Sequence, residues 1–374
     1  MSDLKITYII SNINKAIAFE WITSHMIQHN QLSFILLNPG PSELETFFLQ
    51  NKVPVTRINL QGKSTYLSAL FGVIRYLFKV KPAIIHCHLF DASLIGLAAG
   101  KLLGIKKRIT TRHHSTYNWL YNRKGVWFDK IINSLSTDII AISENVKNVL
   151  IQNEKVNEGK ISLIHHGFDL KAFQQIGKDR IQLIHQKYNP NKKSPVIGVI
   201  SRWIEWKGIQ YIIPAFRKLL VDYPDALLVL ANANGPYKNE IKELLSKLPK
   251  NSYQVIPFEN DLFALYQLFD VYVHAPIDPQ VEAFGQTYVE ALAAGIPSVF
   301  TLSGVAPEFV KHKKNALVVP FKNSDEIYNN IKKLLEDKSL QKNLIEKGRD
   351  SVQLFLLKNM INKLAHLYLG TMSK

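Results

Sequence analysis

The sequence VYVHAPIDPQVEAFGQTYVEALAAGIP, residues 271–297 of this 374-residue chain, contains three structural signals in succession. Residues 271–275 are β-branched, aromatic or small, and prolines follow them, so they predict a buried strand that ends in a loop. Gly285 permits a tight turn and a close approach of the backbone to a ligand. From about Gln286 the apolar spacing predicts a helix, which the Gly-Ile-Pro sequence at 295–297 ends.

Two glutamates lie eight positions apart in this unit. Glu282 falls in the predicted loop and Glu290 about one turn inside the predicted helix, so both can face a ligand that spans the helix start. The free N–H groups and the dipole of a helix start suit a phosphate, and a carboxylate can bind two vicinal hydroxyls. A single Glu in a loop or first helical turn is more often structural. Together the two indicate a site for a sugar nucleotide.

Short apolar strands alternate with helical stretches twice along the chain. The predicted strands are residues 5–10, 33–37, 83–88, 108–111 and 138–142, then 196–201, 226–231, 253–257, 271–275, 297–301 and 316–319. Buried strands separated by helices imply parallel sheets with helices on both faces. We therefore predict an α/β protein with two Rossmann-like, doubly wound parallel-sheet domains, residues 1–175 and 190–351, that face each other across a cleft. Ligands of such sheets bind outside the carboxyl ends of the strands.

Two cations follow the first strand of the second series. Arg202 comes at the strand end, and Lys207 precedes Gly208. Such a pair around a glycine can hold a diphosphate and neutralise a leaving group; the alternative is a solvated loop.

The sequence His86-Cys87-His88 invites a metal interpretation. The two histidines share one face of a strand, and the cysteine points to the other, so the three cannot bind one ion. We expect packing there and no metal site in the chain.

Composition limits the function classes. The net charge of +16 is compatible with nucleic acid, an anionic membrane surface or anionic substrates. No nucleic-acid-binding motif appears, so we expect no nucleic-acid partner. We favour an enzyme that visits an anionic bilayer, with general solubility as the alternative. The single Cys87 excludes an intrachain disulfide and fits the cytoplasm. We expect no signal peptide, because the N-terminal apolar run 6–10 is too short, and no membrane span, because the apolar runs 66–78 and 92–105 are broken by cations.

The motifs taken together resemble the retaining GT-B glycosyltransferases of family 4 (glycosyl transferases group 1). The spacing of Glu282 and Glu290 around Phe-Gly, followed by Glu-Ala-Leu-Ala-Ala-Gly-Ile-Pro, is similar to that family's signature. Further similar landmarks occur in family order over nearly the whole chain: residues 84–88, 110–114, 141–143, 166–169 with Phe173, and 198–202 with Lys207 and Gly208.

This resemblance implies an enzyme (EC 2.4) that transfers a sugar from a UDP- or GDP-sugar to a hydroxyl of a saccharide or lipid-linked acceptor, with the anomeric configuration retained. It implies no cofactor and no metal. Arg202 and Lys207 would stabilise the departing diphosphate, and Glu290 would bind the ribose diol. Glu282 would bind the donor sugar near the reacting carbon, and His113 would complete the sugar site from the N-terminal domain. The backbone of Phe284, Gly285, Gln286 and Thr287 would also contact the donor.

The resemblance also assigns the domains. The N-terminal domain would bind the acceptor and the C-terminal domain the nucleotide sugar, while a helix predicted at 352–369, within the terminal segment 352–374, would cross back to the first domain. The family commonly carries Gly-Gly-x-Glu after strand one. This chain has Ile17-Ala18-Phe19-Glu20 instead, so a donor contact at Ala18 would use its backbone.

The family-level context is bacterial polysaccharide, lipopolysaccharide or other lipid-linked glycan assembly, by a cytoplasmic enzyme peripheral to the inner face of the membrane. Aromatic and cationic residues mix at 119–128, where Trp119, Tyr121, Arg123, Lys124, Trp127 and Phe128 form either a membrane- or acceptor-contacting lobe or a packed amphipathic helix. The alternative functions are a non-catalytic sugar-nucleotide-binding or scaffold protein of the same fold and a GT-B-type nucleotide-sugar epimerase.

Overall fold

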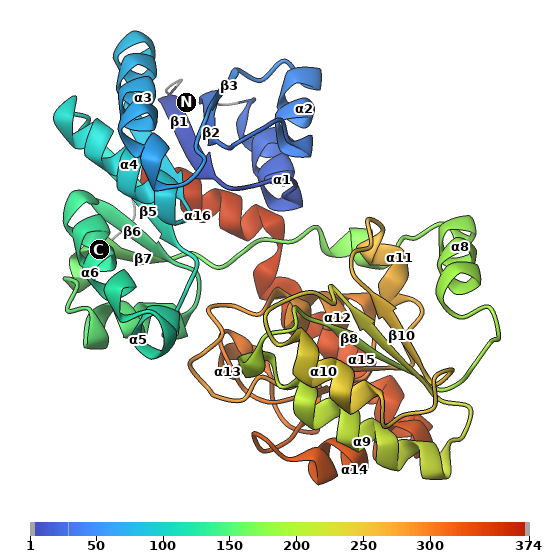
Figure 1. The fold of residues 1–374 in the computed structure, drawn as a ribbon. Coiled ribbons are helices and arrows are strands. Elements are labelled where there is room, and N and C mark those ends of the chain that lie inside the picture. Colours follow the sequence, from blue (N-terminus) through green and yellow to red (C-terminus); the bar gives the residue numbers. More distant parts are fainter. Residues whose placement is uncertain (1–3, 29, 371–374) are drawn as a thin grey trace. The chain divides into compact units, whose positions relative to one another are not determined.

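Two parallel sheets organise the chain in the computed structural model, which describes residues 4–28 and 30–370 (Figure 1). Unit 1 contains the residues up to Phe168 and those from Leu357 onward, and unit 2 is Asp169–Leu356. Each unit contains one sheet with helices on both of its faces. The predicted α/β class with two doubly wound sheets is therefore confirmed.

The sheet of unit 1 has the strand order β3-β2-β1-β4-β5-β6-β7, with every neighbouring pair parallel. Its strands are β1 (Leu4–Ser11), β2 (Asn30–Leu37), β3 (Val55–Ile58), β4 (Ile84–His88), β5 (Lys107–Arg112), β6 (Asp138–Ala141) and β7 (Ile161–Leu163). Its helices are α1 (Ile17–Met26), α2 (Glu43–Gln50), α3 (Tyr66–Val80), α4 (Phe90–Leu102), α5 (Tyr117–Tyr121), α6 (Arg123–Leu135), α7 (Glu144–Asn148) and α16 (Leu357–Leu369).

Strand β1 shows why helices cover both faces of this sheet. Tyr8 packs in the same cluster as residues of α1, α2 and α16, whereas the adjacent Ile9 packs with α3, α4 and α6. Successive side chains of a strand point to opposite faces, so a continuous apolar run needs cover on both sides.

The sheet of unit 2 has the order β10-β9-β8-β11-β12-β13 and is also parallel. Its strands are β8 (Val196–Ile200), β9 (Leu227–Ala231), β10 (Tyr253–Ile256), β11 (Val271–His274), β12 (Ser298–Phe300) and β13 (Leu317–Val318). Its helices are α8 (Lys178–Tyr188), α9 (Ile209–Asp222), α10 (Lys238–Leu245), α11 (Leu262–Tyr266), α12 (Gln286–Ala294), α13 (Ala306–Phe309), α14 (Ser324–Glu336) and α15 (Lys338–Ser351).

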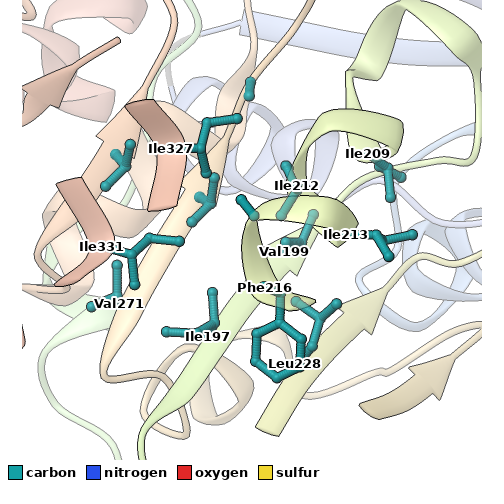
Figure 2. Packing of buried hydrophobic residues seen from close by; sticks show 14 of the residues in the cluster. Ile197, Val199, Ile209, Ile212, Ile213, Phe216, Leu228, Val271, Ile327 and Ile331 are labelled. Atoms are coloured by element: carbon teal, nitrogen blue, oxygen red, sulfur yellow. The ribbon is translucent and has the colours of Figure 1, made fainter. Parts of the chain in front are cut away.

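Aliphatic side chains fill one face of this second sheet. Ile197 and Val199 of β8 pack against Phe216 of α9 and Ile331 of α14 (Figure 2). The other face is aromatic: Tyr288 of α12 meets Phe300 of β12 edge to face, with ring centroids 4.8 Å apart. This packing fixes α12, which carries Glu290, directly on the sheet.

Every predicted strand is present, but two edge strands were missed. β3 and β7 are only partly buried, and Arg57 interrupts β3, so neither shows the continuous apolar run of the central strands. Polar residues destabilise a half-exposed edge strand less than a buried central strand, so an edge strand lacks the apolar run by which strands are recognised in a sequence.

The prediction of one continuous helix over 352–369 was wrong. A 3₁₀ turn, Val352–Phe355, belongs to unit 2, and α16 begins at Leu357 in unit 1. Leu356 separates them with a non-helical ψ of 135°, and the Leu357 N–H donates to the Phe168 carbonyl at 2.9 Å. The apolar pattern continues across this break because both segments bury side chains, each in its own unit.

Candidate functional site

The predicted strand, loop and helix of residues 271–297 are all confirmed. β11 ends at His274, α12 begins at Gln286, and the loop between them carries Glu282. Gly285 has φ +81°, and a Cβ there would lie 2.7 Å from the Tyr288 ring, so a side chain would be strained at this turn.

Lys207 and Glu282 form an ion pair in the structure, with Nζ and Oε1 2.5 Å apart. Gly208, at φ +74°, lets the Lys207 turn approach the loop after β11, since a Cβ there would lie 1.7 Å from the Ala275 carbonyl oxygen. Burial alone would raise the pKa of Glu282, but the Lys207 ammonium and His274 lower it from 4.5 to about 2. The loop therefore holds an ionised, largely buried carboxylate beside a cation.

His274 is a site residue that the sequence interpretation passed over. Its ring is buried, Nε2 lies 3.4 Å from Glu282 Oε1, and the Tyr288 ring contacts it edge to face. Its Nδ1 makes no hydrogen bond within the described residues. Burial lowers the pKa of His274 despite the nearby carboxylate, so the ring is neutral. The available signal was a polar residue at the last position of an otherwise apolar strand.

The start of α12 has unsatisfied backbone donors. The N-cap Gly285 offers no side-chain acceptor, and the N–H groups of Gln286 and Thr287 have no acceptor among the described residues. Together with the helix dipole, these donors suit a phosphate group. The predicted donor contacts at Phe284, Gly285, Gln286 and Thr287 thus lie around one helix start.

Glu290 is the fifth residue of α12, and it is buried against the aromatic face of the sheet. Its Oε2 accepts a hydrogen bond from the Tyr266 hydroxyl at 2.8 Å. Burial raises the pKa of Glu290 from 4.5 to about 7, and the bond from Tyr266 opposes that rise. Tyr266 was not singled out from the sequence, because only the folded structure brings it to Glu290.

Arg202 follows β8 and is exposed. Its guanidinium has no hydrogen bond or ion pair with any of the described residues. Unlike Lys207, it is available to an anion without breaking an existing contact. The neighbouring Trp203 is buried.

His113, the candidate from unit 1, follows β5. Its Nε2 lies 3.0 Å from Nδ1 of His88, and its ring stacks on His166 with centroids 5.6 Å apart. Burial first, and then His166, hold the pKa of His113 well below 6.5, so the ring is neutral at pH 7. The adjacent His114 differs, because its Nε2 lies 3.1 Å from the Asp129 carboxylate.

The segment after strand one, where the family commonly carries Gly-Gly-x-Glu, is helical from Ile17 onward. Ile17–Glu20 forms the first turn of α1, where Ala18 is half-buried and Phe19 packs edge-on against His88. His113 and Ala18 belong to unit 1, so their participation with Glu282 and Lys207 stays a prediction.

The described residues, 4–28 and 30–370, contain no group of three or more His, Cys, Asp or Glu side chains that could hold a metal ion. His86 instead bonds the Tyr368 hydroxyl at 2.6 Å and Thr111 at 2.8 Å, while Cys87 packs in the aliphatic cluster on the opposite face. No described helix combines the length and apolar character needed to cross a membrane.

Family models match both halves of the chain. The model of the glycosyl transferases group 1 matches residues 180–351, and that of Glycosyltransferase Family 4 matches residues 28–172. The capsular polysaccharide biosynthesis glycosyltransferase CapM of Staphylococcus aureus is 27% identical over 298 residues, which cover 77% of this chain and 76% of CapM.

A second relative and one solved structure extend this similarity. The UDP-Gal:alpha-D-GlcNAc-diphosphoundecaprenol alpha-1,3-galactosyltransferase of Escherichia coli is 22% identical, with 81% of this chain and 79% of that protein covered. The structure of Anabaena Alr3699/HepE in complex with UDP and glucose has a TM-score of 0.85 at 20% identity, and the match covers 99% of this chain and 100% of HepE. At that identity the structural likeness shows the fold.

Proposed function

Since the chain belongs to the glycosyl transferases group 1, the retaining GT-B glycosyltransferases of family 4, we propose that it transfers a sugar from a UDP-sugar to a hydroxyl of a saccharide or lipid-linked acceptor. The observation that carries this proposal is the pairing of Lys207 with Glu282 beside the uncapped start of α12. UDP is favoured as the nucleotide because UDP is bound in the HepE structure and UDP-galactose is named as the donor of the E. coli relative.

The geometry of α12 fits the parts of such a donor. Glu290 lies four residues after Gln286, which at 1.5 Å per residue is about 6 Å along the helix. A diphosphate at the helix start would then have the donor ribose on the Glu290 side and the sugar on the Glu282 side. Glu290 accepts hydrogen bonds from the ribose diol once it is ionised, and a carboxylate has enough acceptor sites to keep its bond from Tyr266 as well.

Lys207 and Arg202 neutralise the diphosphate as the bond to the sugar breaks. Preformed cations and backbone N–H groups stabilise charge that develops on a leaving group, because they need little reorganisation. Glu282, ionised beside Lys207, binds donor-sugar hydroxyls and stabilises positive charge at the anomeric carbon. The neutral His113 supplies a hydrogen bond to the sugar from unit 1.

The acceptor is proposed from the relatives and from charge. One relative acts on a diphosphoundecaprenol-linked sugar and another in capsule biosynthesis. The net charge of +16 suits an enzyme that works beside anionic lipid. We therefore place the reaction at the inner face of the cytoplasmic membrane, in surface-glycan assembly.

The proposal is tested by titrating the protein with UDP-sugars and GDP-sugars in a calorimeter and then measuring release of the nucleotide with glycan acceptors. Arg202→Gln should lower turnover at least about hundredfold. Arg217→Gln, which removes another exposed arginine of unit 2, should leave turnover unchanged. Equal activity of the two variants would show that the diphosphate binds elsewhere.

The same assays separate the alternative functions. Binding of a UDP-sugar without turnover by any acceptor would favour a scaffold protein. Conversion of the donor sugar with no acceptor and no nucleotide release would favour an epimerase. Preference for GDP-sugars would overturn the assignment of uridine.

A further inference from the structure

Helix α3 lies at the outside of unit 1 (Figure 1), and its outer face carries large apolar side chains that the described residues leave exposed. Leu67 is 71%, Phe71 68% and Phe78 67% exposed. At 100° per residue these side chains fall within about 40° of arc on the helix. The opposite side of α3 is already apolar, because Ala69 and Val73 are fully buried on the sheet. A surface helix normally presents polar residues outward, so this second apolar face indicates a binding surface.

Cations border this apolar face. Arg75 and Lys79 occupy about the next 80° of arc beyond Phe71 and are exposed. From Thr46 to Phe128 the only acidic residue is Asp91, whereas lysines and arginines recur throughout. The Asp91 carboxylate accepts hydrogen bonds from Asn12 and from Tyr66 at the start of α3. The outer face of α3 is therefore positive as well as apolar.

A shallow hollow continues the face at the C-terminal end of α3. It has a volume of about 500 Å³, and Phe78 and Leu103 line it together with Ile105. Lys81 and Lys106 are the only charged residues among those that line it. An apolar floor with lysines at its edge suits the phosphate and the upper acyl chain of an anionic lipid.

We propose that the outer face of α3, defined by Leu67, Phe71, Phe78, Arg75 and Lys79, docks on an anionic phospholipid bilayer. The helix has 15 residues and is thus about 22 Å long, too short to span a hydrocarbon core of about 30 Å but suited to lie in the interface. The apolar side chains enter the boundary between headgroups and acyl chains, and the cations contact lipid phosphates. Stable attachment needs both contributions, and this face supplies both.

The segment 119–128 offers a weaker surface. It forms α5 and the first turns of α6, where Phe128 packs edge-on against Phe90 with centroids 5.6 Å apart. Trp127 is 62% and Tyr121 47% exposed, but Phe128 is packed rather than free to insert. Membrane docking by α3 would benefit the enzyme because the proposed acceptor is lipid-linked, and in that respect the inference rests on the proposed function. Vesicle binding is measured without any sugar transfer, so it can fail or succeed independently of the proposed function.

The test is co-sedimentation of the full chain with vesicles of phosphatidylglycerol and phosphatidylcholine. The variant Leu67→Ser, Phe71→Ser, Phe78→Ser should bind at least about thirtyfold more weakly than the wild type. Arg75→Gln with Lys79→Gln should weaken binding about tenfold or more at low salt. A control variant, Leu183→Ser with Val221→Ser, removes two comparably exposed apolar side chains from unit 2 and should bind as the wild type.

Several outcomes would overturn the proposal. Undiminished vesicle binding by the α3 serine variant would do so, as would loss of binding only in Trp127→Ser with Tyr121→Ser. Equal binding of the wild type to vesicles of phosphatidylcholine alone would refute the requirement for anionic lipid. A wild-type dimer in vesicle-free solution that the α3 serine variant breaks would identify a second copy as the occupant. Unchanged circular dichroism and UDP-sugar binding of the variant show that it folds and that the donor site is intact.

Discussion

Replacing Lys207 by methionine removes the cation that holds Glu282 ionised. Lys207 and Glu282 are 75 positions apart in sequence and pair at 2.5 Å, with side chains 19% and 8% exposed. Methionine keeps much of the volume but no charge. The variant would therefore leave a buried carboxylate without its partner, which is among the more destabilising single changes in proteins.

The size of this effect follows from the pKa of Glu282. A carboxyl group whose pKa is lowered on folding contributes stability above its unfolded pKa and loses it as the pH falls through its folded pKa. The decrease from 4.5 to about 2 corresponds to about 3 kcal/mol at pH 7. The contribution falls to about 1 kcal/mol at pH 3. Without the ammonium, burial raises the pKa instead, so this stability is absent from the variant at neutral pH.

The assay is urea-dependent hydrogen exchange resolved by mass spectrometry, which reports the opening of β8 and β11 separately from unit 1. We expect Lys207→Met to lower the opening free energy by about 3 kcal/mol at pH 7, with a smaller difference from the wild type at pH 3. Lys218→Met removes a surface cation paired with Asp325, and both partners are about half exposed or more, so it should change little. A destabilisation by Lys207→Met that is equal at pH 7 and pH 3 would refute the role of the ion pair.

Three further outcomes are expected. Affinity for a UDP-sugar should fall about tenfold for each pH unit below about 7, because burial raises the pKa of Glu290 to about 7 and only the ionised form accepts both ribose hydroxyls. Calorimetry at several pH values measures this, and the Glu290→Gln variant should show no such dependence. Gly208→Ala should cost about 1–3 kcal/mol and lower turnover, since its Cβ would meet the Ala275 carbonyl; wild-type kinetics would contradict this. Arg112→Met should destabilise unit 1 by about 3–5 kcal/mol in thermal unfolding, because it removes the cation from buried Glu154 and leaves only the hydrogen bond from Asn133. An unchanged midpoint would disprove it.

The sequence alone predicted the parts of the fold that burial dictates. Central strands such as β4 and β11 are fully buried, so their apolar runs are visible without a structure. The strands β3 and β7 were missed because they are half-exposed and lack a continuous apolar run. The break in the last predicted helix at Leu356 was missed because apolar residues on both sides of it pack in different units.

The candidate site was predicted where its residues are close in sequence. Glu282, Gly285 and Glu290 follow from local spacing around one helix start. The contact of Glu282 with Lys207, the ring of His274 beneath it and the bond from Tyr266 depend on tertiary packing between segments far apart in sequence. The second apolar face of α3 was likewise hidden, because an apolar run does not show which of its side chains the sheet leaves exposed.

Retaining transfer from a UDP-sugar is tested most directly by hydrolysis of a UDP-α-sugar that binds, with water as the acceptor. The measured quantity is the anomeric configuration of the sugar that is released first. Proton NMR at times shorter than mutarotation distinguishes the two anomers of the free sugar. We expect the α-anomer to appear first together with UDP, and to disappear as a product in Arg202→Gln. Initial release of the β-anomer, or no UDP release from any bound donor, would contradict the account.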